Sequence, residues 1–130
     1  MGLIYNLLAH ALVPALKRKL NQRALAEPLY AQFMNERWGH YEGSARPVDV
    51  WLHTVSLGEA RAARVLIDRL REQRPDWTWV FTQGTATGRT EMAQCVRPGD
   101  VQVWQPWDTP QAVESFFQHF SPRLGLLMET

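Results

Sequence analysis

The sequence has little of what marks several common classes of protein. Its single cysteine, Cys95, excludes an internal disulfide framework, which needs paired thiols. The formal net charge of +1 provides no overall attraction to nucleic acid. No apolar run reaches the roughly 20 residues of a membrane-spanning helix. The 130 residues are 45% hydrophobic and 21% charged, a composition typical of one folded domain with a hydrophobic core.

Familiar chemical motifs are missing as well. The four histidines lack metal-ligand spacing and Cys95 has no thiol partner, so we expect neither a metal nor a cofactor. The glycines form no Walker loop and no dinucleotide fingerprint, and Ser56 is not part of a nucleophile elbow. Aromatic and basic residues are not interleaved as in RNA-binding sheets, so we expect no nucleic-acid partner.

Residues 1–42 are predicted to form an N-terminal helical segment. A helix would align five apolar residues on one side, namely Ile4, Leu8, Ala11, Leu12 and Ala15. Four cations follow the apolar run, namely Lys17, Arg18, Lys19 and Arg23. This order is the reverse of a signal peptide. An amphipathic, basic helix predicts docking on an anionic membrane surface, and packing against a protein domain is the alternative.

Beyond a linker at 43–47, strands alternate with helices. The predicted strands are 48–54, 77–82, 101–104 and 123–128, and the predicted helices are 58–74, 86–94 and 110–120. This alternation predicts an α/β fold with a Rossmann-like parallel sheet and right-handed crossovers. The helix over 58–74 should bury one apolar stripe, formed by Ala60, Ala63, Leu66, Ile67 and Leu70. We expect Arg71 on its opposite, solvated side.

The segment Ser56-Leu-Gly-Glu59 follows the first predicted strand. Ligands of open α/β sheets bind beyond the carboxyl ends of the strands, which makes Glu59 a candidate general base. The helix N-terminus would keep this carboxylate ionised, and Gly58 would allow close approach of a substrate. The same residues match a capping box, in which Ser56 and Glu59 only satisfy backbone N–H groups. The local sequence leaves both interpretations open.

Two further loops should reach the same edge of the sheet. Thr85-Ala-Thr-Gly88 could offer backbone N–H groups to a phosphate or sugar hydroxyl, although Thr85 is equally explained as a helix cap. Asp108 is expected to cap the helix that starts near Pro110. Glu129 follows the last predicted strand and belongs to this edge too.

Taken together, these loops resemble the N-terminal part of the 3-deoxy-D-manno-octulosonic acid (Kdo) transferase family. The resemblance is carried by His53-Thr-Val-Ser-Leu-Gly-Glu59, Thr85-Ala-Thr-Gly88, Pro106-Trp-Asp-x-Pro110 and Met128-Glu-Thr130. The leading segment Asn35-Glu-Arg-Trp-Gly-His-Tyr41 is similar to the family's E-R-[WY]-G signature. Gln83 and Gly84 depart from the family's usual T-T-x-T-x-T-G turn, which puts acceptor contacts there in question.

The resemblance implies half of a two-domain GT-B glycosyltransferase that transfers Kdo from CMP-Kdo to the lipid A precursor. Residues 48–130 would be its acceptor-side domain, and a donor domain beyond them would hold CMP-Kdo. Glu59 would be the general base, with acceptor contacts from Ser56, Gly58, Thr85, Thr87, Gly88 and Glu129. The N-terminal helix would dock on the cytoplasmic face of the bacterial inner membrane.

Without a donor domain, the 130-residue chain is expected not to transfer sugar alone. Two alternatives remain from the sequence: another GT-B glycosyltransferase with a different donor, and a non-catalytic α/β ligand-binding module in which Glu59 is only a cap.

Overall fold

Short runs of β-branched and aromatic residues form a four-stranded parallel sheet at the centre of the chain. The computed structural model describes residues 2–26, 28 and 32–129, apart from the side chains of residues 20–26. Its strands are β1 (Val50–Thr54), β2 (Trp79–Gln83), β3 (Val101–Trp104) and β4 (Leu124–Leu127). They lie in the order β3-β2-β1-β4, so the predicted α/β fold with a parallel sheet is confirmed.

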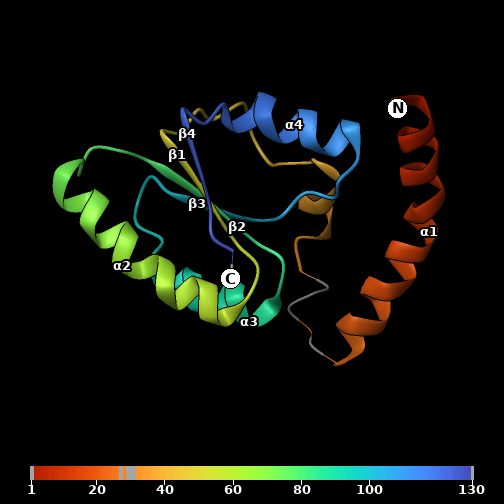
Figure 1. Ribbon diagram of the computed structural model, residues 1–130, viewed down its shortest axis with the longest axis horizontal. Coiled ribbons are helices and arrows are strands. Elements are labelled where there is room, and N and C mark those ends of the chain that lie inside the picture. Colours follow the sequence, from red (N-terminus) through yellow and green to blue (C-terminus); the bar gives the residue numbers. More distant parts are fainter. Residues whose placement is uncertain (1, 27, 29–31, 130) are drawn as a thin grey trace.

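Three helices connect the strands and cover both faces of the sheet. They are α2 (Leu57–Gln73), α3 (Ala86–Ala93) and α4 (Pro110–Phe120). Figure 1 shows α2 and α3 on one face of the sheet and α4 on the other. Helix α2 starts one residue before the predicted 58–74. Strand β2 starts two residues after the predicted start at Trp77. The limits of β3 and α4 are those predicted.

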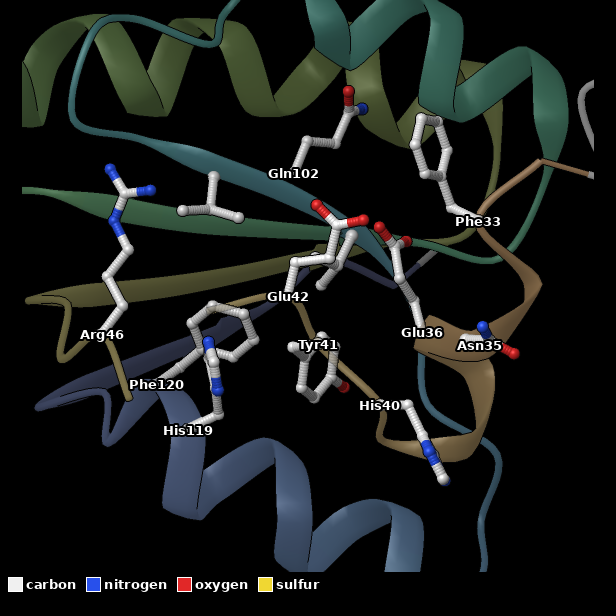
Figure 2. Close-up of a pocket in the computed structure, with 12 residues that line it drawn as sticks. Phe33, Asn35, Glu36, His40, Tyr41, Glu42, Arg46, Gln102, His119 and Phe120 are labelled. Atoms are coloured by element: carbon white, nitrogen blue, oxygen red, sulfur yellow. The ribbon is translucent and has the colours of Figure 1, made fainter. Parts of the chain in front are cut away.

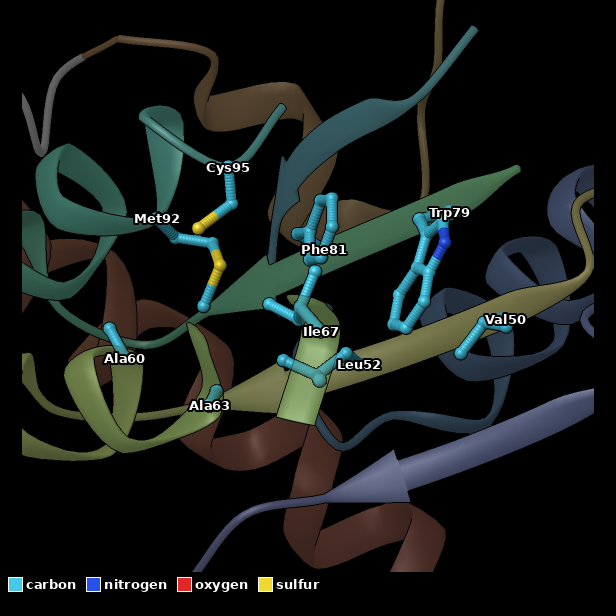
Figure 3. Packing of buried hydrophobic residues seen from close by; sticks show 9 residues of the cluster. All are labelled: Val50, Leu52, Ala60, Ala63, Ile67, Trp79, Phe81, Met92 and Cys95. Carbon is cyan, nitrogen blue, oxygen red and sulfur yellow. The ribbon is translucent and has the colours of Figure 1, made fainter. Parts of the chain in front are cut away.

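Two apolar clusters pack on the two faces of the sheet, as period-2 alternation along strands requires. One cluster joins Leu52 and Phe81 to Ile67 of α2 and to Met92 and Cys95 (Figure 3). The other joins the opposite sides of the same strands to Phe116 and Phe120 of α4. This double coverage accounts for the nearly continuous apolar character of the central strands.

Helix α2 differs from its predicted stripe at two positions. Ala60, Ala63 and Ile67 are fully buried as expected, but Leu66 is 36% exposed. Arg71, expected in solvent, is only 7% exposed and forms an ion pair with Asp100. Helical periodicity places Arg71 on the polar side, but it cannot show that the chain after α3 returns to cover that position.

Helix α1 (Gly2–Ala26) runs alongside the domain (Figure 1). Its partly buried face consists of Asn6, Ala9, Val13 and Leu16. The Tyr5 hydroxyl donates to the carboxylate of Asp108, and Lys17 Nζ lies 5.3 Å from the centre of the Trp38 ring. The predicted apolar stripe lies on the other side, exposed along its whole length. No helix in the described ranges is long and apolar enough to cross a membrane.

A 3-10 helix, η2 (Met34–Trp38), joins the N-terminal part to the sheet. It ends at Gly39, whose φ of 82° favours glycine. A Cβ at Gly39 would also lie 2.7 Å from Cβ of Ser115 in α4. Glycine therefore allows η2 to pack closely on α4. The sequence also predicts a helix start at Pro28. Its neighbours, residues 27 and 29–31, lie outside the described residues.

Candidate functional site

The predicted site residues lie on the loops that leave the carboxyl ends of the strands. The loops after β1 and β2 are joined by Thr85, whose hydroxyl donates to the carbonyl of Val55 over 2.6 Å. Gly88 makes this contact possible, since a Cβ there would lie 3.0 Å from the same carbonyl oxygen. The loop after β4 joins them through Met128, whose N–H donates to the carbonyl of His53. The structure thus brings the separate sequence motifs to one edge.

Glu59 forms the capping box that its sequence allows. Its Oε2 accepts from the backbone N–H of Val55 at 2.6 Å and of Ser56 at 3.4 Å, while its own N–H donates to Ser56 Oγ at 3.2 Å. The side chain is folded back toward its own backbone and is only 8% exposed. The capping box predicted from Ser56-x-x-Glu59 is therefore present. Gly58 beside it is exposed, and a Cβ there would meet only Ser56 Oγ, at 4.0 Å.

The second loop is also explained by local capping. Thr85 is the N-cap of α3 and its Oγ1 accepts from the N–H of Gly88 at 3.2 Å. Thr87 is exposed to solvent at the start of α3, whereas Gly88 is buried under the first loop. The third loop corrects a prediction, because Thr109 rather than Asp108 caps α4. Both residues are good caps, and Asp108 binds Tyr5 instead.

His53 is a member of this edge that the sequence reasoning passed over. Its Nδ1 lies 2.8 Å from Thr82 Oγ1, which also accepts from the indole N–H of Trp51. Burial lowers the pKa of His53, and the negative charges of Glu59 and Glu129 oppose that shift. Two predicted site carboxylates therefore act on one imidazole. The order His53-x-x-x-x-x-Glu59 on a strand and its following turn was the available signal.

Glu129 is exposed immediately after β4, as its position in the sequence predicts. The Met128 hydrogen bond to His53 holds this segment against the end of β1. Among the basic residues predicted to dock on a membrane, Lys17, Arg18 and Lys19 are exposed on α1. The side chain of Arg23 lies outside the described residues.

A separate cavity of about 420 Å³ lies between residues 33–46, β3 and α4 (Figure 2). The side chains of Glu36 and Glu42 extend toward β3, which contributes Gln102. The hydroxyl of Tyr41 is buried, and nothing in the described part of the chain hydrogen-bonds to it. Burial and the charge of Glu36 raise the pKa of Tyr41. None of the site residues predicted from the sequence lines this cavity.

No group of three or more His, Cys, Asp or Glu side chains among residues 2–26, 28 and 32–129 is placed to hold a metal ion. The edge instead collects carboxylates, hydroxyls, an imidazole and backbone N–H groups. These groups can accept or donate protons and can bind hydroxylated or anionic groups.

A parallel sheet, crossover helices on both faces and motif loops at the carboxyl edge define a Rossmann-like α/β domain of the glycosyltransferase type. Within that class, residues 32–130 match the family described as 3-Deoxy-D-manno-octulosonic-acid transferase (kdotransferase). The chain belongs to this family and corresponds to its N-terminal part.

Individual relatives agree with this assignment. The chain is 35% identical to a 3-deoxy-D-manno-octulosonic acid transferase of Bordetella pertussis, over 97% of this chain and 31% of that protein. It is 28% identical to a probable mitochondrial transferase of the same name from Arabidopsis thaliana, over 97% of this chain and 28% of the relative. A Haemophilus influenzae transferase is 28% identical over 82% of this chain and 26% of its own length. The chain thus spans about a third or less of these relatives, and no solved structure matches it.

Proposed function

We propose that this chain is the acceptor side of a GT-B enzyme that transfers Kdo from CMP-Kdo to the lipid A precursor. The observation that carries the proposal is the meeting of Glu59, the Thr85–Gly88 turn and Glu129 at one edge of a sheet in a chain of the Kdo transferase family. Residues beyond this chain would hold CMP-Kdo. We further propose that the enzyme works at the cytoplasmic face of the bacterial inner membrane.

In this proposal Glu59 is the general base. It would remove the proton from an acceptor glucosamine hydroxyl as that oxygen attacks the anomeric carbon of Kdo, and CMP would leave. Its capping bonds support the role, because N–H donors favour the ionised carboxylate and hold it in one orientation. Gly58 is exposed and has no side chain, which would admit the acceptor.

The acceptor contacts are proposed for the groups around this carboxylate. Thr87 and Glu129 are exposed and can hydrogen-bond to sugar hydroxyls. Ser56 orders the first loop through its capping bond to Glu59, and Thr85 and Gly88 hold the second loop against the first through the Thr85 bond to Val55 and the close approach of Gly88. Their substitution should therefore change the affinity for the acceptor through the shape of the edge.

The proposal is tested by joining this chain to the C-terminal remainder of the Bordetella pertussis relative. We expect the chimera to transfer Kdo from CMP-Kdo to lipid A precursor. Glu59→Gln should reduce kcat by about 10²–10⁴-fold, the usual contribution of a general base. The capping box accepts glutamine, so thermal stability should hardly change. Glu72→Gln, at an exposed carboxylate of the same helix, is the matched control.

Two results would contradict the proposal at different levels. A folded chimera that binds CMP-Kdo but transfers no Kdo would refute the assigned reaction. An active chimera in which Glu59→Gln keeps the parental rate would leave Glu59 as a helix cap only.

Membrane docking by α1 is part of the same proposal. Its apolar stripe is exposed on the side away from the domain, and three described cations follow that stripe. Reversing Lys17, Arg18, Lys19 and Arg23 to glutamate should weaken binding to anionic vesicles, by about 1 kcal/mol for each charge near the surface. Neutral vesicles should show a much smaller difference between the two proteins. Equal binding to anionic vesicles would contradict docking through these charges.

A further inference from the structure

We infer that Arg37 is a positioning residue for the proposed reaction, because it ties together the loops that hold Glu59 in place. The inference rests on the proposed function for its catalytic consequence, whereas the loop coupling itself concerns this chain alone. Arg37 belongs to the Asn35–Tyr41 segment that is similar to a family signature, but the sequence assigns it no role at the site, because it lies in η2, ahead of the first strand.

The Arg37 side chain is held among loop backbone and aromatic rings. It is only 3% exposed. Its guanidinium donates to the carbonyl of Gly84, after β2, at 3.3 Å and to the carbonyl of Gln105, after β3, at 3.5 Å. The guanidinium carbon also lies 4.6 Å from the ring centres of both Trp104 and Trp107. One buried cation therefore bridges two loops of the site edge.

Backbone and neighbouring charges hold Arg37 in this position. Its own carbonyl accepts from the N–H of Trp107 at 2.8 Å, which fixes the third loop a second time. The preceding residue, Glu36, accepts from the N–H of Trp104 at 2.7 Å and pairs with Arg89 of α3 at 3.0 Å. Glu36 and Arg37 thus bind the ends of both edge loops from one short 3-10 helix.

A short series of contacts leads from Arg37 to the proposed base. Gly84, whose carbonyl Arg37 binds, is followed by Thr85, whose hydroxyl donates to the carbonyl of Val55 at 2.6 Å. The N–H of Val55 in turn donates to Glu59 Oε2 at 2.6 Å. Movement of the second loop would therefore move the backbone that orients the Glu59 carboxylate.

The arrangement requires arginine rather than a positive charge alone. A planar guanidinium carries five N–H donors and stacks on aromatic faces, so it can reach two carbonyls while lying between two indole rings. A lysine ammonium is a compact point charge on a flexible stem and cannot keep this geometry. Arg37→Lys should consequently behave like Arg37→Met at the site, although it preserves the charge.

The chain provides a matched control at the other end of the sheet. Arg71 is also buried, donates to the carbonyl of Cys95 at 2.7 Å and lies 5.5 Å from the ring centre of Trp79. Its partners lie near the amino ends of the strands, whereas Glu59 lies beyond the carboxyl end of β1. Arg71→Lys should lower stability without changing the order of the site loops.

The first test uses the 130-residue chain and amide hydrogen exchange. In Arg37→Lys we expect the amides of Val55 and Ser56 to exchange about 2–10-fold faster, the range for loss of one net hydrogen bond. The amide of Phe81, in the centre of β2, should keep its rate. Arg71→Lys should leave the ratio of Val55 to Phe81 exchange unchanged. Equal acceleration of all three amides in Arg37→Lys, or none, would overturn the inference.

Should Arg37→Lys fail to fold, Trp107→Phe provides the same readout with a smaller change, because it removes part of one ring from the guanidinium. We then expect a smaller, still selective acceleration at Val55 and Ser56. An unselective or absent response in this variant would again overturn the inference.

The second test separates positioning from binding in the active chimera. Arg37→Lys should reduce kcat by about 10–100-fold, the range for a slight misplacement of reacting groups, with the KM for CMP-Kdo unchanged. Arg71→Lys should retain kcat at temperatures where it is folded. An unchanged kcat in Arg37→Lys would contradict the catalytic consequence. Failure of the Glu59→Gln test would refute the base instead, and the exchange result would still stand on its own.

Discussion

The two ends of the sheet contain buried arginines with different partners. At the amino ends of the strands, Arg71 forms an ion pair with Asp100, which also accepts from the N–H of Trp79 at 3.0 Å. At the carboxyl ends, Arg37 donates to two loop carbonyls and lies between two indole rings. The first arrangement is a buried ion pair that joins α2 to the start of β3. The second one holds loops in register, and it does so where the proposed substrate would bind.

The comparison indicates that the buried arginine at one end contributes mainly to the free energy of unfolding. The buried arginine at the other end mainly fixes the positions of the site loops. Removing one member of a buried ion pair leaves an uncompensated charge, which is among the most destabilising changes in a protein. Removing a loop tie leaves the core in place and changes only the local arrangement. The two ends should therefore respond differently to substitution, in size and in kind.

The largest effect is expected from Asp100→Ala. This change leaves Arg71 buried without its carboxylate and removes the acceptor for two backbone N–H groups, those of Trp79 and Arg97. We expect a loss of about 3–5 kcal/mol in the free energy of unfolding, measured by urea denaturation. Arg123→Ala breaks an exposed ion pair with Asp49 and should cost less than about 1 kcal/mol. Similar losses for both would show that the buried ion pair at this end contributes no more than an exposed one.

A smaller effect is expected from Gly88→Ala at the carboxyl edge. The new Cβ would lie 2.9 Å from Thr85 Oγ1 and 3.0 Å from the carbonyl oxygen of Val55. Overpacking of this kind costs about 1–3 kcal/mol in unfolding free energy. Gly58→Ala is the matched control, because its Cβ would make only an ordinary contact with Ser56 Oγ at 4.0 Å, and it should be neutral or slightly stabilising. The interpretation fails if both variants unfold at the same urea concentration.

The smallest effect concerns pH and His53. Burial lowers its pKa below the ordinary value of 6.5, against the opposing charges of Glu59 and Glu129. At higher pH the imidazole is neutral in both states and contributes no pH dependence. As the pH falls below about 6.5, the unfolded chain binds the proton first, so folded stability decreases until the lowered native pKa is reached.

The corresponding variant is His53→Gln. Its melting temperature should fall less between pH 7.5 and 5.5 than that of the unchanged chain. His40→Gln, at an exposed histidine, controls for the loss of one imidazole. A pH dependence identical to that of the unchanged chain would show that His53 does not contribute to it.

The elements that could be predicted are those whose signals are local. Ser56 with Glu59, Thr85, and Pro110 mark helix starts within a few residues, and the structure places the helices there. Short apolar runs between these helices predicted the strands. The alternation of strands and helices along the chain then indicated a parallel sheet. Such local signals are accurate to about one residue. The predicted cap of α4 was Asp108 and the observed cap is its neighbour Thr109, since either side chain can cap a helix.

The features that were missed depend on residues distant in the sequence. Arg71 is buried because Asp100 and Cys95 return to cover α2. Arg37 gains its partners from the loops after β2 and β3, much later in the chain. Leu66 shows the opposite case, because it fits the apolar period of α2 but no part of the described chain buries it fully. Helical periodicity shows which residues of one element share a face. Whether that face is buried depends on which other elements pack against it.

The position of β1 between β2 and β4 has a consequence for the order of folding during synthesis. Val50 pairs with Trp79 and also with Leu124, so one edge of β1 is matched early and the other must wait for the last strand. Pairing of strands so distant in sequence is slow, and folding on the ribosome proceeds from the N-terminus. Glu129 lies two residues after the end of β4, so it can reach the edge that holds Glu59 only when β4 docks. A nascent chain that has not reached β4 would expose one edge of β1 and would lack a member of the proposed site.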